Sequence, residues 1–304
     1  MSLHYYTADV FTDRPFGGNQ LAVFPDATDI PEELLLPITR EFNFSEVTFV
    51  YPPAEARHTR RVRIFTPGGE IPFAGHPTVG TAFVLFATGE LRASCDDATV
   101  VLEEGVGAVP VRLRFRDGGA APVFAQLSAA KLPEFGPPAV DVATLASVLS
   151  LDVADFLGGD YAPETVSVGL PFLIVPLRDR AAVRRARMKV DAWERTLRGT
   201  ASSEVMVFAL DPERPGTDLR ARVFVPGLNV PEDPATGSAS ACLGGYLARR
   251  TPRDGTLRWV SEQGVEMGRP SVIEIEVDKA GGQVTAVRCG GSAVLIGAGK
   301  LVIG

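Results

Sequence analysis

The sequence has few of the residues that build metal sites, disulfide frameworks or membrane spans. It holds three cysteines without CxxC spacing and three histidines outside any metal-ligand cluster, so neither a structural metal nor a disulfide scaffold is expected. No apolar run reaches about 18 residues, and the N-terminus lacks the pattern of a signal peptide. We therefore expect a reducing, cytoplasmic environment, no metal and no membrane partner.

Blocks of positive charge are also missing. The chain has 30 basic and 37 acidic residues and a formal net charge of −7, and a surface of this sign repels nucleic-acid phosphates and anionic lipid. Nucleic acid is therefore excluded as a partner. The 304 residues, of which 45% are apolar, can build the core of one large domain or of two ordinary ones.

Short segments with β-branched or alternating apolar residues make up most of the chain. Glycine, proline and aspartate turns separate them, which predicts many short strands. The expected helices are fewer, and they span residues 31–42, 77–88, 141–150, 179–198 and 238–250.

Two pairs of motifs indicate an internal duplication. SEVTFV at 45–50 recurs as SEVMVFA at 203–209, and RIFTPGGEIP at 63–72 recurs as RVFVPGLNVP at 222–231. Chance similarity between β-rich segments is the alternative. The offsets of 158 and 159 residues are nearly equal, which favours a true repeat.

Each repeat ends in a helix, 77–88 or 238–250, that is apolar or small on nearly every face. Such a helix must be buried on all sides. We therefore expect an α+β fold with two pseudo-symmetric lobes, each a curved, mostly antiparallel β-sheet or barrel around a central helix, with the helix N-termini facing one cleft. The expected lobes are residues 1–120, with 290–304 as a candidate completing strand, and residues 121–289.

The sequence in front of each central helix lacks bulky side chains. A helix N-terminus carries unpaired N–H donors and a partial positive charge, so an open N-terminus can bind an anion. In GHPT, Pro77 suits the first helical position and Gly75 leaves the backbone accessible, while ATGS places Gly237 and Ser238 at the second helix. These two sites would bind a small carboxylate and stabilise an enolate-like intermediate. Ordinary capping by Thr236 or Ser238 is the alternative.

Proton transfer needs ionisable groups beside these helix starts, and the candidates are Glu46, Glu70, His76, Glu232 and Asp233. Glu46 lies between apolar residues, where burial would make it a stronger base toward a carbon acid; a solvated position is the alternative. His76 would act as a neutral donor at a helix N-terminus, or merely as a cap. Asp233 would accept a hydrogen bond from a ligand, or merely favour the helix dipole.

Taken together, these motifs resemble the PhzF-like phenazine-biosynthesis family over essentially the whole chain. The resemblance is carried by FTDRPFGGNQLAVF, NFSEVTFV, FTPGGEIPFAGHPTVGTA, EDPATGSASACLGGYL, EQGVEMGRPSVIEIEV and GGSAVLIGAGKL. It implies a fold like that of diaminopimelate epimerase and a homodimer that needs no cofactor. It also implies that Glu46 is the catalytic acid/base, that His76, Asp233 and Ser238 assist or contact the substrate, and that Asn19 is a substrate contact.

The chain departs from the related epimerases in its cysteines. Those enzymes use a cysteine at each helix start, whereas this chain has Ala74-Gly75-His76 at one start and Ala235-Thr236-Gly237-Ser238 at the other. We expect its cysteines to lie away from both starts, with Cys242 in the core. A single carboxylate that removes and redelivers one proton is therefore favoured over a pair of thiols.

The sequence thus predicts an isomerase that moves a proton within a small, anionic, carboxylate-bearing substrate. Two alternatives remain open. One is a lyase or dehydratase, in which the same carboxylate removes an α-proton and a hydroxyl group leaves. The other is a non-catalytic protein that binds a small molecule in the same cleft.

Overall fold

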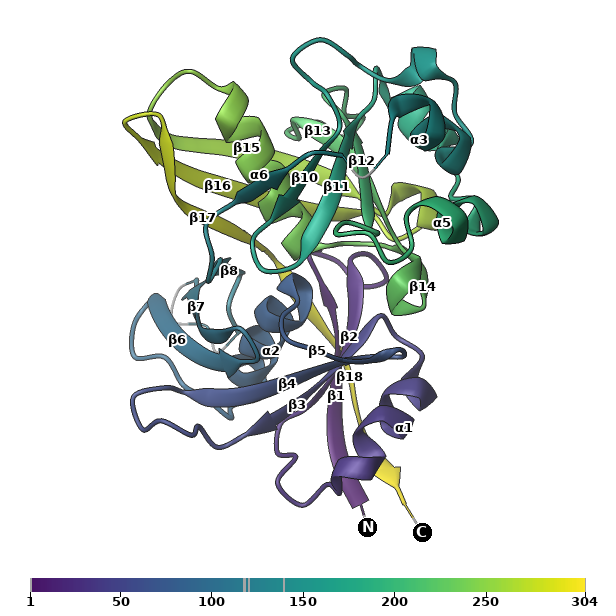
Figure 1. Cartoon of the computed structure of the whole chain (residues 1–304). Helices are drawn as coiled ribbons and strands as arrows, with labels where there is room; N and C mark the ends of the chain where they lie inside the picture. Colours follow the sequence, from purple (N-terminus) through teal and green to yellow (C-terminus); the bar gives the residue numbers. More distant parts are fainter. Residues whose placement is uncertain (1, 117–118, 120, 139, 304) are drawn as a thin grey trace. The chain divides into compact units, whose positions relative to one another are not determined.

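The computed structural model describes residues 2–116, 119, 121–138 and 140–303. The chain divides into two compact units, residues 1–130 with 290–304 and residues 131–289 (Figure 1). The division falls after residue 130, whereas the sequence placed it after 120, because β8 (Phe124–Ser128) pairs with β7 (Gly107–Arg114) of the first unit. The last strand, β18 (Ala293–Val302), pairs with β1 (Ser2–Val10), so it belongs to the first unit as well.

The first unit also contains two helices and the strands between β1 and β7. The helices are α1 (Glu32–Phe42) and α2 (Gly75–Ala87). The strands are β2 (Asn19–Phe24), β3 (Glu46–Tyr51), β4 (Arg60–Thr66), β5 (Gly69–Ile71) and β6 (Asp97–Glu104).

The second unit has more helical segments. Its helices are α3 (Val142–Leu149), α4 (Arg180–Arg185), α5 (Val190–Thr196) and α6 (Gly237–Arg250), with 3-10 helices η1 (Val153–Asp155), η2 (Pro226–Leu228) and η3 (Val265–Met267). Its strands are β9 (Glu134–Gly136), β10 (Glu164–Ser167), β11 (Pro171–Pro176), β12 (Val205–Ala209), β13 (Leu219–Val225), β14 (Val230–Asp233), β15 (Gly255–Gln263), β16 (Ser271–Ala280) and β17 (Gln283–Gly291).

Both units repeat one pattern of strand pairing. In the first unit β2 and β3 are parallel, β3 and β4 are antiparallel, and β4 pairs with β5 on one stretch and with β6, in parallel, on another. In the second unit β11 to β15 repeat these pairings in the same order and directions. This shared topology confirms the duplication inferred from the repeated motifs.

α2 and α6 are the central helices of the two units. Every residue of α2 from Gly75 to Phe86 is buried, and so is every residue of α6 from Gly237 to Ala248. α2 contacts β1, β2, β3, β7, β8 and β18, while α6 contacts β10, β11, β15 and β16, so strands surround each helix (Figure 1). A helix without a polar face must be buried in this way, and each unit has the expected α+β architecture.

The start of α2 differs from the expected one. α2 begins at Gly75, so Pro77 is its third residue rather than its first. Proline is tolerated there because the N–H groups of the first turn have no carbonyl partner inside the helix. Pro77 therefore marks the first turn without marking its first residue.

The helix expected over 179–198 is two helices, α4 and α5. The guanidinium group of Arg222 donates to the carbonyl oxygens of Val183, Arg184 and Ala186. A continuing helix would need these carbonyls as acceptors for its own N–H groups. A side chain from β13 thus ends α4, which the local sequence does not reveal.

Candidate active site

Asn19, Glu46 and His76 lie together at the start of α2 in the first unit. Oε2 of Glu46 lies 3.4 Å from Nε2 of His76, and Nδ2 of Asn19 donates to Nδ1 of His76 over 3.1 Å. All three side chains are buried. The structure therefore brings together three residues that the sequence proposed on separate segments.

The sheet and one glycine create this proximity. β2 and β3 run parallel, with Leu21 beside Glu46, so Asn19 and Glu46 lie at the same ends of neighbouring strands. Gly80 lets α2 approach these strands closely. A Cβ at this position would lie 2.5 Å from Cγ2 of Val10 and 2.6 Å from Cδ2 of Leu21. Either these side chains or α2 would have to shift to admit a Cβ, so the present approach of α2 depends on the missing side chain of Gly80.

A buried hydrogen bond fixes α2 along β3. Oγ1 of Thr48 lies 2.8 Å from Oγ1 of Thr81. Thr48 is on the same face of β3 as Glu46, because strand side chains alternate. The bond therefore holds the first turns of α2, with His76, against the beginning of β3.

The His76 ring is neutral at ordinary pH. Burial lowers its pKa to about 3, with an opposing contribution from a hydrogen bond to the Gln20 backbone. The amide nitrogen of Asn19 can only donate, and this contact favours the tautomer with the ring proton on Nε2, which makes no hydrogen bond to a described residue. The ring can thus donate a hydrogen bond without adding a charge to the site.

The start of α2 suits an anion. Its N-cap, Ala74, makes no side-chain hydrogen bond to the first turn, and its first residue, Gly75, adds no side chain. The N-terminus of a helix carries roughly half a positive charge on its N–H groups. Gly75 and His76 therefore present backbone polarity that can stabilise a carboxylate or an enolate.

The start of α6 in the second unit holds the other predicted residues. Thr236, the N-cap, donates from Oγ1 to Oδ2 of Asp233 over 2.5 Å, rather than capping the helix. Nε2 of Gln263 donates to the Asp233 carbonyl over 2.7 Å and to Thr236 Oγ1 over 3.1 Å. Gly237 and Ser238 follow as the first two helical residues, and both are buried. The sequence missed Gln263, because only the fold brings β15 to this helix.

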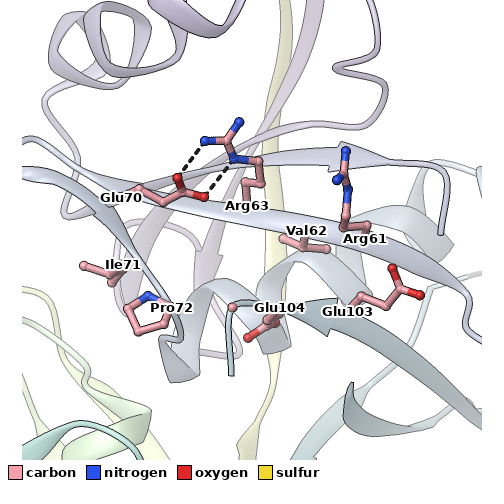
Figure 2. A pocket seen from close by; sticks show the side chains of 9 residues that line it. Arg61, Val62, Arg63, Glu70, Ile71, Pro72, Glu103 and Glu104 are labelled. Atoms are coloured by element: carbon pink, nitrogen blue, oxygen red, sulfur yellow. Dashed lines mark hydrogen bonds and ion pairs between the residues drawn. The ribbon is translucent and has the colours of Figure 1, made fainter. Parts of the chain in front are cut away.

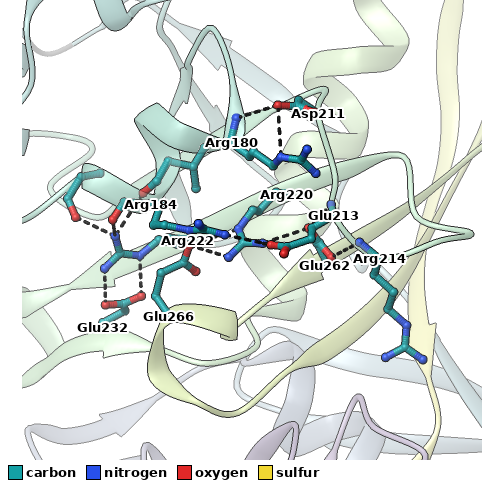
Figure 3. A network of polar contacts seen from close by, with 12 residues as sticks. Arg180, Arg184, Asp211, Glu213, Arg214, Arg220, Arg222, Glu232, Glu262 and Glu266 are labelled. Atoms are coloured by element: carbon teal, nitrogen blue, oxygen red, sulfur yellow. Dashed lines mark hydrogen bonds and ion pairs between the residues drawn. The ribbon is translucent and has the colours of Figure 1, made fainter.

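Two other candidate carboxylates belong to ion pairs. Glu70 accepts from Nε and Nη2 of Arg63 at 2.8 and 2.6 Å. Glu232 accepts from Nε and Nη2 of Arg222, both at 2.8 Å (Figure 3). The two arginines occupy corresponding positions of the duplicated motif. Both carboxylates are engaged in bidentate ion pairs, so Glu70 and Glu232 fit a structural role better than proton transfer.

Glu204 is a buried carboxyl group that the sequence did not single out. It is the counterpart of Glu46 in the repeated SEV motif, and that repeat was the available signal. Oε1 accepts from Ser203 Oγ over 3.0 Å, and a Cβ on Gly227 would lie 2.3 Å from this oxygen. Burial raises the pKa of Glu204 to about 7, against hydrogen bonds from Ser203 and the Gly227 backbone.

One expectation about the cysteines is wrong. Cys289 lies at the start of α6, with Sγ 3.3 Å from the Gly237 carbonyl oxygen, because β17 passes this turn of the helix. Cys242 is buried as expected, and Cys95 is exposed. Burial raises the pKa of Cys242 and of Cys289 to about 12. Both are therefore thiols at neutral pH.

The described part of the chain offers no evident metal site. Within residues 2–116, 119, 121–138 and 140–303, His, Cys, Asp and Glu form no group of three that could hold a metal ion. Over the same residues, no helix is both long enough and apolar enough to cross a bilayer.

The chain is similar to proteins with isomerase names. The family model described as phenazine biosynthesis-like protein, PhzC-PhzF, matches residues 8–299. An uncharacterized isomerase from Mesorhizobium japonicum is 38% identical, over 99% of both chains. The trans-2,3-dihydro-3-hydroxyanthranilate isomerase of Pseudomonas aeruginosa is 33% identical, over 97% of this chain and 98% of its own.

Solved structures support the same relationship. A Bacillus anthracis phenazine biosynthesis protein of the PhzF family superposes with a TM-score of 0.88 at 25% identity, over the full length of both chains. A hydroxyproline epimerase from Agrobacterium vitis shares the fold alone, with a TM-score of 0.66 at 12% identity over 99% of this chain and 91% of its own. The expected epimerase-like fold is therefore confirmed, and the chain belongs to the PhzC-PhzF family of phenazine biosynthesis-like proteins.

Proposed function

We propose that this family isomerase moves a proton within a small carboxylate-bearing substrate, with Glu46 as the single acid/base and without a cofactor. The observation that carries the proposal is the buried Glu46 carboxylate, 3.4 Å from a neutral His76 at the start of α2. Glu46 takes a proton from a substrate carbon and becomes a carboxylic acid. The electron pair left behind delocalises, and Glu46 then returns the same proton to another carbon.

The other residues position the substrate. Nε2–H of His76 donates to the substrate oxygen on which negative charge develops, and Asn19 holds the ring in that tautomer. The N–H groups at Gly75 stabilise the same charge electrostatically. Asp233, Gly237 and Ser238 stay proposed contacts of the substrate in the second unit.

The first substrate to test is trans-2,3-dihydro-3-hydroxyanthranilate, for which the Pseudomonas aeruginosa relative is named. It should be followed by other cyclic and acyclic amino and hydroxy acids, screened by thermal shift. Each hit is incubated in D₂O, and its carbon-bound hydrogens are followed by NMR. An isomer of unchanged heavy-atom composition supports the proposal. A product that has lost water indicates a lyase, and binding without exchange or turnover indicates a binding protein.

Glu46→Gln is the decisive variant. It preserves shape but removes the only proposed proton carrier, so turnover should fall by at least about 10²–10⁴-fold while ligand affinity changes only a few-fold. Cys242→Ser is the control, since Cys242 is a buried thiol of the second unit whose Sγ contacts the Leu170 carbonyl oxygen. It should lower stability and leave the chemistry intact. Full activity of Glu46→Gln would contradict the one-carboxylate mechanism.

A further inference from the structure

Glu104, the last residue of β6, approaches the first turn of α2 from the side of the sheet. It lines a hollow of about 580 Å³ between β4, β5 and the end of β6 (Figure 2). Its side chain is nevertheless buried, with 8% of the residue exposed. Oε1 lies 2.7 Å from Oγ1 of Thr78, and Oε2 has no hydrogen-bond partner among the described residues.

Counting protons shows which group donates. Oγ1 of Thr78 is also 2.7 Å from the carbonyl oxygen of Ala74, the N-cap of α2. That carbonyl can only accept, so the single hydroxyl proton of Thr78 serves it. The short contact between Thr78 and Glu104 is then a hydrogen bond only if Glu104 donates. A carboxyl group can donate only when it is protonated.

The second unit contains a comparable contact to its N-cap threonine, made by a residue that cannot ionise. Gln263 lies 159 positions after Glu104, the offset of the duplicated motif. Its Nε2 donates to the hydroxyl of Thr236, and this hydroxyl donates to Asp233 at the start of α6. In both units, therefore, a side chain at the end of the corresponding strand meets a threonine hydroxyl at the start of the central helix. Gln263 is a neutral donor by its chemistry, and Glu104 can match it only as an acid.

The surroundings of Glu104 agree with a neutral form. Burial raises the pKa of Glu104 to about 8. Four charged residues share the hollow, namely Arg61, Arg63, Glu70 and Glu103. Arg63 is held by Glu70 and Glu32, and Glu103 is held by the N–H groups of Ala54 and Glu55 and by His58. On α2, the ionisable neighbour of Thr78 is His76, whose pKa of about 3 keeps it neutral.

We propose that Glu104 is a positioning residue that stays a neutral carboxylic acid and donates to Thr78, thereby fixing the first turn of α2. The inference rests on the proposed function, because this turn carries Gly75 and His76. When Glu104 loses its proton, the Thr78 hydroxyl must turn toward the carboxylate and leave the Ala74 carbonyl. The Ala74 carbonyl is then held only by the Thr78 N–H, at 3.3 Å, so the helix start is held less firmly and His76 loses its fixed place beside Glu46.

Glu104→Gln separates this role from mere packing, because glutamine keeps the donor and cannot ionise. Glu104→Leu removes the donor, and Glu70→Gln is the matched control with the same chemical change in the same hollow. With trans-2,3-dihydro-3-hydroxyanthranilate as substrate, the parent and Glu70→Gln should lose about tenfold in kcat per pH unit above about pH 8. Glu104→Gln should keep its neutral-pH activity and lack this alkaline decline. Glu104→Leu should be impaired at every pH.

Two readouts do not depend on turnover. At about pH 6, the infrared difference spectrum of the parent minus Glu104→Gln should contain the carbonyl band of a protonated carboxyl group. The raised folded-state pKa also means that the parent loses stability relative to Glu104→Gln as the pH rises from about 5 to about 8. The Tm difference should therefore grow over this range and should stay constant for Glu70→Gln.

The outcomes separate the two proposals. Absence of the protonated-carboxyl band together with a constant Tm difference would overturn the role of Glu104, whatever the activity shows. So would an unchanged alkaline decline in Glu104→Gln. Presence of the band in a protein that turns over no substrate and exchanges no carbon-bound hydrogen would support Glu104 as a neutral donor and count against the proposed function.

Discussion

Glu204 lies directly before β12 as Glu46 begins β3, yet the surroundings of the two carboxyl groups differ. Glu46 faces an imidazole, while Oε1 of Glu204 accepts from the hydroxyl of Ser203, and its Oε2 has no partner among the described residues. A buried carboxyl group with little compensation favours its protonated form. Stability should therefore report the ionisation of Glu204.

We expect Glu204→Gln to become progressively more stable than the parent as the pH rises from about 4.5 to about 7, by up to about 3 kcal/mol. The pKa of Glu204 is raised to about 7 in the folded protein. Its contribution to stability is therefore fully present below the unfolded pKa and is lost as the pH rises through the folded one. Urea unfolding of both proteins across this range is the measurement.

The control for this experiment is Glu194→Gln, which removes an exposed carboxylate paired with Arg198, four residues later in the chain. Its effect should be small and should show no comparable slope. A stability difference between Glu204→Gln and the parent that does not depend on pH would show that Glu204 does not titrate in this range.

For individual residues, the sequence predicted which residue types matter better than it predicted their contacts. Glu46 and His76 stood out because each lies in a motif rich in apolar or small residues. Gln263 and Glu104 did not, because each ends a strand whose partner is the distant start of a helix. The position of Cys289 was predicted wrongly for the same reason. It lies far from Gly237 in the chain, and only the fold brings β17 to the first turn of α6.

Among the elements, α2 is held by close contacts on one side and a hydrogen bond on another. Gly80 meets Val10 and Leu21, and Thr81 meets Thr48. Because both contacts lie within two turns of His76, the position of the helix also sets the position of the imidazole.

Gly80→Ala should therefore destabilise the protein by about 1–3 kcal/mol, since the added methyl group has no space. It should also lower turnover, because α2 must move away from β1 and β2 and carry His76 with it. Thermal unfolding and the D₂O exchange assay measure the two effects. Gly136→Ala is the control, because a Cβ there makes only an ordinary 3.7 Å contact with Thr165. Equal effects of both substitutions would contradict the close approach at Gly80.

The sequence predicted helices and strands well where a single local property, such as an apolar surface on every face, determines the structure. The helices at α2 and α6 were expected because they are apolar on every face, and their burial follows. The single helix expected over 179–198 failed because Arg222, far along the chain, binds the carbonyls at the end of α4. Tertiary contacts of this kind leave no local pattern.

Across the whole molecule, the two duplicated halves share a glutamate that binds the N–H groups of a loop, but they differ in the surroundings of a nearby arginine. Glu103 accepts from the N–H groups of Ala54 and Glu55, and Glu262 accepts from Glu213 and Arg214, each pair at an offset of 159. Arg220, in contrast, is fully buried among Glu213, Glu262 and Glu266 (Figure 3).

The counterpart of Arg220 in the first unit is Arg61, which is exposed and lies over the Tyr51 ring. Removing one partner from a buried charge cluster costs about 3–5 kcal/mol, because the remaining charges stay buried and unpaired. We therefore expect Arg220→Met to cost about this much and Arg61→Met to change stability by less than about 0.5 kcal/mol. Urea unfolding of the two variants is the comparison, and similar losses would show that the Arg220 cluster contributes no more than a surface charge.

The pairing of β1 with β18 imposes an order on synthesis of the protein. Residues 131–289 form one uninterrupted stretch, so the second unit forms its contacts within consecutive segments, whereas the first unit needs segments on both sides of it. β1 leaves the ribosome well before its partner β18, because the whole second unit lies between them in the chain. Until then one edge of β1 stays open to pairing with other chains. A pause in translation before residue 290 would therefore leave the first unit, with Glu46 and His76, dependent on chaperones.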